Sequence, residues 1–231
     1  MKLLLTSNGL CNDSIRGALR DMLGKPTKES NMVFVMTGSW PVRGDKTWLV
    51  DDLRRAHDMG WKAFDVLDLA VMADWEKRLW MPAFESADVI MFCGGHTQYL
   101  SYWLQKSGLM DELPRLLESK IYIGISAGSM VATKSTLTSS IQLRKFAGLP
   151  DNESKEAPKG QSSDKAVGLT DFLFRPHLNS SNFPFSRVDF MQQVATKRHE
   201  KIYLVDDEGA VKVDGDTVEV VSEGEWHLLK G

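Results

Sequence analysis

The stretch IYIGISAGSM, residues 121–130, decides the fold of this chain more than any other. An apolar run of strand-forming residues ends at Gly124, Ser126 follows within the pattern GxSxG, and the next residues suit a helix. This order is typical of a nucleophile elbow, where small neighbours allow a strained turn and the serine side chain projects from the sheet. The free N–H groups of the helix favour negative charge beside that serine. The pattern therefore predicts a nucleophilic serine, although an ordinary glycine-rich turn can carry the same letters.

Strands and helices alternate on both sides of this stretch. Apolar segments with strand character are followed by segments with helical spacing and capping residues. The predicted strands span residues 3–7, 32–37, 63–69, the apolar part of 87–95, 121–124, 172–174 and 201–206. The predicted helices span residues 13–23, 47–59, 75–85 and 186–197. Such alternation indicates an α/β fold with a mostly parallel sheet, helices on both faces and ligands beyond the carboxyl ends of the strands.

Length and charge limit the class of protein. The chain has 231 residues, which suits one α/β domain over residues 1–231. With 28 basic and 31 acidic residues the net charge is -3, and no basic stripe alternates with aromatic residues, so nucleic acid is not expected as a partner. No apolar run approaches the ~20 residues of a membrane span, so no membrane partner is expected either.

The cysteines and the N-terminal segment indicate a location. Cys11 and Cys93 show neither a CxxC pattern nor Cys/His spacing, which favours a reducing cytoplasm and gives no sign of a metal or another cofactor. The segment MKLLLTSNGL, residues 1–10, predicts a first strand, because its apolar run is too short for a signal peptide. We therefore expect a cytoplasmic protein.

His177 is the strongest candidate for the base that activates the serine. The strand 172–174 is followed by Pro176, which keeps the preceding residue extended, so His177 lies at a strand end on the side expected for Ser126. An imidazole can accept the serine proton near neutral pH. His96, in a glycine turn at the same edge, is a competitor, and a purely structural role for His177 stays open.

The turn GGHT, residues 94–97, follows another predicted strand and falls at the same edge as the serine. Glycines allow a backbone to approach a substrate closely. The N–H groups of Gly95 and Ala127 are candidates for an oxyanion hole, a pair of donors that stabilises charge on a carbonyl oxygen. An ordinary strand-to-helix turn is the alternative.

Acidic residues follow the strand that begins near residue 201. Asp206, Asp207 and Glu208 stand just before a glycine, and a carboxylate here is suited to orient the histidine. For Asp206 and Asp207 a solvated turn is the preferred interpretation, and spacing alone does not settle the role of Glu208. Residues 211–230 alternate as strands do around a DG turn and predict an antiparallel hairpin.

The segment 148–166 differs in composition from the rest of the chain. It is polar, contains proline and has few large apolar residues. We expect a long mobile loop, because loops of this length in compact domains are either functional or disordered. A lid over the serine and simple disorder both agree with its position.

Several of these segments together resemble a known family. LLLTSN, GGHT, YIGISAGS, RPHLN and an acidic residue in an EG turn occur in the order typical of peptidase E, the aspartyl dipeptidase group of serine peptidases related to cyanophycinase. The resemblance covers essentially the whole chain, and YIGISAGS and RPHLN are its most specific parts. It implies the three-layer α/β sandwich of class I glutamine amidotransferase-like proteins, with serine in place of their cysteine.

The same resemblance implies roles for individual residues. Ser126 is expected as the nucleophile, His177 as the base and Glu208 as the acid that orients it, with Gly95 and Ala127 as oxyanion donors. The order serine, histidine, acid argues against the α/β-hydrolase family, in which the acid precedes the histidine.

Substrate binding departs from the family pattern at the glycine turn. Family members usually carry Asn before the Thr, whereas His96 precedes Thr97 here, and we expect both residues to contact the substrate. Arg187 takes the position of an arginine credited with recognising an N-terminal aspartate, and a solvent-facing helix arginine is the alternative. A guanidinium suits a carboxylate because it donates two parallel hydrogen bonds.

The resemblance implies a serine exopeptidase that cleaves short peptides through an acyl-enzyme, above all dipeptides with an N-terminal aspartyl residue. We expect it to act as a monomer or homodimer. A related amide hydrolase of the β-aspartyl or cyanophycinase type, a non-catalytic binding or regulatory member, and an α/β-hydrolase esterase are the alternatives.

Overall fold

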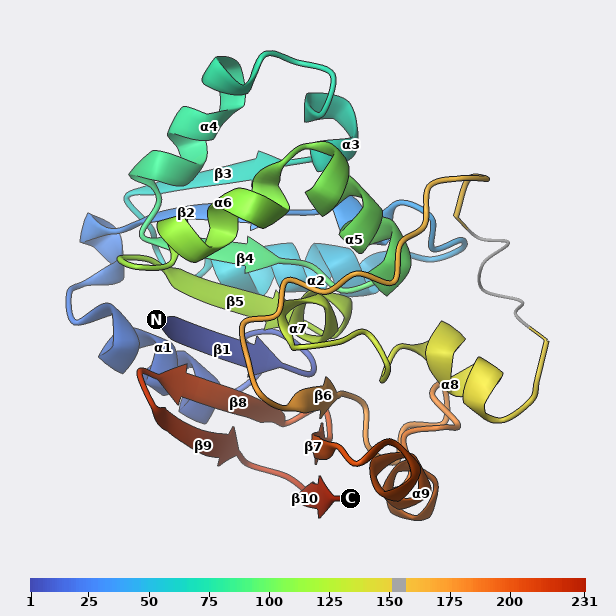
Figure 1. Ribbon diagram of the computed structural model, residues 1–231. Helices are drawn as coiled ribbons and strands as arrows, with labels where there is room; N and C mark the ends of the chain where they lie inside the picture. Colours follow the sequence, from blue (N-terminus) through green and yellow to red (C-terminus); the bar gives the residue numbers. More distant parts are fainter. Residues whose placement is uncertain (151–156) are drawn as a thin grey trace.

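Seven strands form the central sheet of the computed structural model, which describes residues 1–150 and 157–231 (Figure 1). The strand order is β3-β2-β4-β5-β1-β8-β9; from β3 to β1 the strands run parallel, and β8 and β9 are antiparallel to their neighbours. The strands are β1 (Lys2–Thr6), β2 (Asn31–Val35), β3 (Ala63–Leu67), β4 (Val89–Phe92), β5 (Ile121–Ile125), β8 (Gly209–Asp214) and β9 (Thr217–Ser222). The predicted α/β class, with a mostly parallel sheet and a C-terminal antiparallel hairpin, is confirmed.

Helices cover both faces of this sheet and complete a three-layer arrangement (Figure 1). One face carries α1 (Asp13–Leu23) and α2 (Thr47–His57). The other face carries α3 (Leu69–Met72), α4 (Lys77–Ser86), α5 (Thr97–Lys106), α6 (Leu109–Leu116) and α7 (Ala127–Ala132). Short 3-10 helices, η1 (Thr27–Glu29) and η2 (Thr37–Ser39), flank β2. Among the residues described, no helix combines the length and the apolar character that crossing a membrane requires.

Alternating side chains of the strands fill two cores, one on each face of the sheet. In β1, Leu4 packs on the side of α1 and α2, whereas Leu3 and Leu5 pack on the opposite side. In β4, Met91 packs on the side of α1 and α2, and Ile90 packs on the opposite side. This two-residue period is that of a strand buried on both faces, and each such buried side chain contributes about 1.5–3 kcal/mol. The packed sheet therefore fixes the positions at which the loops of its carboxyl edge begin.

A second, smaller sheet has the order β10-β7-β6. Its strands and flanking helices are β6 (Leu173–Arg175), β7 (Lys201–Val205), β10 (Trp226–Lys230), α8 (Ser140–Phe146) and α9 (Val188–Arg198). β10 pairs antiparallel with β7, and β6 pairs parallel with it. The sequence prediction placed the last strand in the hairpin and did not foresee this sheet. Its core brings Leu229, Ile202 and Met191 together.

Capping residues set the helix ends near the predicted positions. Asn12 accepts a hydrogen bond from N of Ile15 at the start of α1, and Gly24 adopts a left-handed φ of 64° after its end. Glycine is favoured there because a Cβ atom would strain this backbone. α2 ends at His57 and not at residue 59, and the helices α3, α5, α6 and α8 were not predicted.

The predicted mobile loop 148–166 follows α8. Residues 151–156 of this loop lie outside the described part of the chain. From residue 157 to residue 166 the chain forms neither helix nor strand. Ser163 is held against α5, because its N donates to O of Gln98 and its Oγ accepts from Gln105 Nε2. The mobility of the loop stays a prediction.

Candidate active site

Ser126 lies at the sharp turn between β5 and α7. Its backbone has φ 47° and ψ -100°, a positive-φ conformation that is uncommon outside glycine and costs about 1–3 kcal/mol. Backbone hydrogen bonds hold it there: N of Ser126 donates to O of Thr6 at 3.0 Å, and N of Met130 donates to O of Ser126 at 2.9 Å. The neighbouring β1 and the first turn of α7 therefore fix the strained residue.

Close packing requires the glycines of the GxSxG pattern. A Cβ atom on Gly124 would lie 2.4 Å from N of Ser129, and one on Gly128 would lie 2.3 Å from O of Phe92. Both distances are far shorter than a van der Waals contact. α7 therefore rests directly on β5 and β4, and this packing leaves Ser126 at the sheet edge with a partly accessible side chain.

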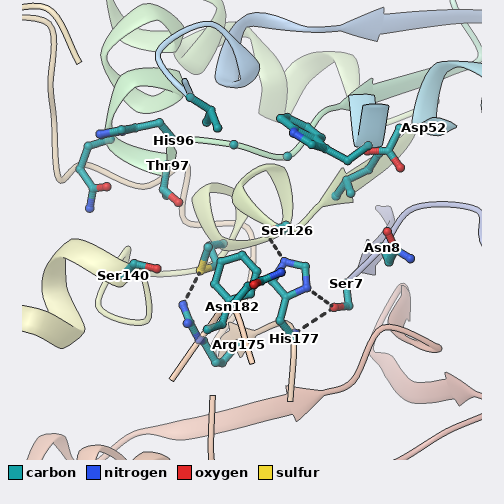
Figure 2. A pocket seen from close by; sticks show the side chains of 18 residues that line it. Ser7, Asn8, Asp52, His96, Thr97, Ser126, Ser140, Arg175, His177 and Asn182 are labelled. Atoms are coloured by element: carbon teal, nitrogen blue, oxygen red, sulfur yellow. Dashed lines mark hydrogen bonds between the residues drawn. The ribbon is translucent and has the colours of Figure 1, made fainter. Parts of the chain in front are cut away.

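His177 brings its ring to the serine from the loop after β6 (Figure 2). His177 Nε2 lies 2.9 Å from Ser126 Oγ, within hydrogen-bond distance. The ring stacks on Phe183, with centroids 4.1 Å apart and an angle of 11° between the planes. The backbone of His177 has a φ of 62°, so the loop turns sharply at this residue. The structure thus brings together the serine and the histidine that the sequence analysis paired.

The carboxylate beside His177 is that of Asp207 and not that of Glu208. Asp207 Oδ1 lies 2.6 Å from His177 Nδ1. Glu208 is exposed, and its Oε2 accepts a hydrogen bond from Asn12 Nδ2 at 3.1 Å. In the tight turn from β7 to β8, where N of Glu208 donates to Asp206 Oδ1, successive side chains point in different directions. The sequence analysis expected Glu208 to orient His177. The structure differs, because the turn directs the side chain of Asp207 toward the His177 ring.

The electrostatics of Asp207 suit a partner of the histidine. Burial opposes the charge, but hydrogen bonds from His177 and Ser7, together with the attraction between the carboxylate and the protonated form of His177, lower the pKa of Asp207 below its ordinary value. A charged carboxylate only accepts hydrogen bonds, so the network assigns the imidazole hydrogen to Nδ1. The lone pair of Nε2 then faces Ser126.

Ser7, directly after β1, connects these groups, and the sequence analysis missed it. Its Oγ donates to Asp207 Oδ1 at 2.9 Å and accepts a hydrogen bond from N of His177 at 2.9 Å. The residue is fully buried. A signal was present in the sequence: Ser7 follows a predicted strand, and parallel strands such as β1 and β5 end at the same edge of a sheet.

The glycine turn after β4 lies next to the serine. A Cβ atom on Gly94 would lie 3.6 Å from Ser126 Cβ, and one on Gly95 would lie 2.2 Å from O of Gly38. Gly95 also has a φ of 118°, which disfavours any other residue. Ala127 begins α7, where backbone N–H groups have no partner within the helix. Gly95 lines the same cavity as Ser126, and Ala127 directly follows the serine; their role as oxyanion donors stays a prediction.

The expected substrate-binding residues fall in different places. His96 and Thr97 line the cavity that contains the serine. His96 Nδ1 also accepts a hydrogen bond at 3.1 Å from a backbone N–H in the first turn of α5, so this ring caps the helix. Of the described residues, those that line the cavity do not include Arg187. Its guanidinium donates to neighbouring main-chain carbonyl oxygens at 3.0 and 3.1 Å.

Ser126 and His177 share a cavity of about 420 Å³. Its lining includes the buried side chains of Asp52 and Arg175, which the sequence analysis did not single out as binding residues. Arg175 is 1% exposed and donates from Nε to Ser186 Oγ at 2.8 Å. Within the described ranges, no group of three or more His, Cys, Asp or Glu side chains is arranged to hold a metal ion.

Comparisons with known proteins identify a family and a fold. The family model described as Peptidase family S51 matches residues 3–221. A candidate peptidase E protein from Listeria monocytogenes EGD-e has 21% identity and a TM-score of 0.71, over 96% of this chain and 98% of its own. A peptidase from an acI-B1 Actinobacterium has 16% identity and a TM-score of 0.66, over 100% of this chain and 91% of its own. No curated protein matches the chain. At these identities the structural matches establish the fold alone.

Proposed function

The chain belongs to peptidase family S51 and is a serine peptidase, and we propose that Ser126, His177 and Asp207 perform its chemistry. One observation carries this proposal: an unbroken hydrogen-bonded path leads from Ser126 Oγ through the ring of His177 to Asp207, with distances of 2.9 and 2.6 Å. Such a path provides a nucleophile, a base and a group that stabilises the charged base.

The reaction proceeds in two stages through an acyl-enzyme. Ser126 Oγ attacks the carbonyl carbon of the scissile peptide bond while His177 Nε2 takes the hydroxyl proton. Asp207 holds Nδ1–H and stabilises the imidazolium. The imidazolium then gives its proton to the leaving amine, and the acyl group stays on Ser126 as an ester. His177 next deprotonates a water molecule, which hydrolyses the ester and restores the serine.

Negative charge on the carbonyl oxygen is stabilised by the N–H groups of Gly95 and Ala127. These donors lie on the glycine turn after β4 and at the start of α7, on elements that packing holds in place. Each donor of this kind contributes roughly 10²- to 10³-fold to the rate. Fixed donors require little reorganisation during the reaction.

The dimensions of the cavity favour short peptides as substrates. Its volume of about 420 Å³ lies within the range of ~300–1,000 Å³ typical of small-ligand sites. We favour dipeptides with an N-terminal aspartyl residue, because the lining includes Arg175, whose positive charge attracts a side-chain carboxylate. The free thiols of Cys11 and Cys93 agree with a cytoplasmic location. A monomeric or homodimeric state completes the proposal and is measured by light scattering.

The decisive experiment measures amine release from a panel of Asp-X, Glu-X and β-aspartyl dipeptides. Ser126→Ala should lower kcat for Asp-Leu by about 10⁴-fold or more, because no other group replaces the nucleophile. Ser119→Ala, which alters an exposed serine far along the sheet, serves as the control. Hydrolysis of Asp-Leu by Ser126→Ala at the wild-type rate would refute the proposal. Preference for the β-aspartyl members of the panel would identify a cyanophycinase-like specificity instead.

A further inference from the structure

Asp52 is a buried acid in the same cavity as Ser126, and the mechanism above gives it no task. It lies on α2 four residues after Trp48, so the two side chains occupy the same face of the helix. Both line the cavity. The Trp48 ring lies 3.7 Å from the Cβ position of Gly94, which is itself 3.6 Å from Ser126 Cβ. Asp52 therefore lies one helical turn from a residue that borders the nucleophile.

The carboxyl group of Asp52 is incompletely paired. The residue is 4% exposed, and its Oδ1 has no hydrogen-bond partner among the described residues. Arg55 Nη1 lies 3.9 Å from Oδ1, too far for a hydrogen bond, and donates to O of Asn8 at 3.3 Å instead. A buried carboxylate is costly unless it is paired and hydrogen-bonded. Among the described residues, no hydrogen bond to Oδ1 offsets this cost.

The surroundings of Asp52 leave its charge poorly stabilised. Burial raises the pKa of Asp52 to about 7, Asp51 adds to this rise, and Arg55 opposes it. The negative charge of Asp52 also contributes to the high pKa of the buried thiol of Cys93, which burial chiefly causes. The charged form is therefore accessible near neutral pH, and a cation that enters the cavity would stabilise it.

The acidic and the basic side chain of the cavity lining, Asp52 and Arg175, lie apart. Figure 2 shows Asp52 and Asn8 on one side of the Ser126–His177 pair and Arg175 on the other. A peptide with a free N-terminus carries an α-ammonium on the carbon next to the carbonyl that the serine attacks. We propose that Asp52 binds a primary ammonium group of the peptide substrate, above all this α-ammonium. The inference deepens the proposed peptidase function and rests on it.

Such an ion pair makes the enzyme selective for the ends of peptides. An N-terminal α-ammonium would satisfy the carboxylate of Asp52 with a charge-assisted hydrogen bond. A peptide that continues on the N-terminal side, or that is acetylated there, would place a neutral amide against a buried charge. Asp52 would thus favour cleavage after the first residue.

The test compares wild type with Asp52→Asn, which keeps the shape of the side chain and removes its charge. For a free aspartyl dipeptide we expect KM to rise about 10- to 100-fold, the loss typical of one charge-assisted hydrogen bond, while kcat changes far less. For the Nα-acetyl form of the same dipeptide the two enzymes should have equal constants. Asp58→Asn is the matched control, because this exposed residue at the C-terminal end of α2 is not among the groups that shift the pKa of Asp52, and it should change neither value.

A lysyl arm identifies the source of the ammonium group. If Asp52→Asn raises KM only for an Nα-acetyl-lysyl dipeptide, Asp52 binds a side-chain ammonium. If it raises KM only for dipeptides with a free N-terminus, Asp52 binds the α-ammonium. If Asp52→Asn raised KM equally for free and for fully blocked peptides, or raised it for none of them, the proposal would be overturned.

A binding measurement removes the dependence on turnover. Calorimetry of the free dipeptide with Ser126→Ala should show about 10- to 100-fold tighter binding than with the Ser126→Ala/Asp52→Asn double variant. Equal affinities would contradict the role of Asp52. Full peptidase activity of Ser126→Ala would instead contradict the proposed function, so the two failures can be told apart.

Discussion

Asp207 Oδ1 lies 2.6 Å from His177 Nδ1, and this contact joins the turn after β7 to the loop after β6. The two residues are 30 positions apart in the sequence. They meet because β6 and β7 are parallel neighbours, so the loops that follow these strands leave the second sheet at the same edge. Ser126 comes from the end of β5 in the central sheet. The site is therefore assembled where the two sheets adjoin.

The roles of the two acids in this turn can be separated by amide variants. Asp207→Asn should lower kcat for a dipeptide about 10³- to 10⁴-fold, because a neutral amide neither fixes the tautomer of His177 nor stabilises its charge. Glu208→Gln should retain nearly full activity, since Glu208 contacts Asn12 and not the ring. Steady-state kinetics of both variants decide the matter. A greater loss in Glu208→Gln would return the orienting role to that residue.

Ser7→Ala should weaken catalysis without abolishing it. The change removes one of the two hydrogen bonds that lower the pKa of Asp207, the other being that from His177, and leaves N of His177 without its acceptor. We expect kcat/KM to fall about tenfold, as for the loss of one or two buried hydrogen bonds. Because the pKa of Asp207 rises, activity on the acidic side should be lost at a higher pH than in wild type. Ser119→Ala, at an exposed position, should leave the pH profile unchanged.

Asp52 should make the stability of the fold depend on pH. Folded Asp52 keeps its proton up to a pKa of about 7, mainly because of burial, whereas an unfolded aspartate loses it near pH ~3.9. The unfolding free energy therefore falls as the pH rises between these values and stays lower above them. Asp52→Asn removes this effect. Arg55, Asp51 and Cys93, the ionisable groups around it, are unchanged.

Urea unfolding at acidic and alkaline pH measures this dependence. Relative to wild type, Asp52→Asn should gain on the order of 2–4 kcal/mol between pH ~4 and pH ~8. Asp58→Asn, exposed at the C-terminal end of the same helix, should show no such gain. The same difference from wild type at both pH values would mean that Asp52 titrates normally in the folded protein.

Two glycine variants test the packing that shapes the elbow. Gly128→Ala places a Cβ atom 2.3 Å from O of Phe92 and should destabilise the protein by about 3 kcal/mol. Gly17→Ala, in the middle of α1 with no atom within 4 Å of the new Cβ, should stabilise it by about 0.5–1 kcal/mol. Thermal unfolding of both variants provides the comparison. A loss of equal size in the two would show that close contact with β4 does not explain the motif.

Much of the fold could be predicted because its signals are local. Hydrophobic spacing and turn residues located the strands of the central sheet and the helices α1, α2 and α4 within a few residues, whereas α3, α5 and α6 were not predicted. The strands of the second sheet were predicted, but their assembly into a separate sheet was missed, since β6, β7 and β10 pair across separations that no local pattern specifies. The glycines around Ser126 marked the elbow because a Cβ at either position would collide with nearby backbone.

The sequence by itself therefore determined the alternation of elements, the strained serine and the histidine after β6, because interactions between close neighbours in the chain set these features. Only the tertiary structure decided that Asp207 and Ser7 meet His177 and that Asp52 enters the cavity. The direction of a side chain in a turn, and the meeting of segments far apart in sequence, depend on how whole strands and helices pack. No short pattern carries that information.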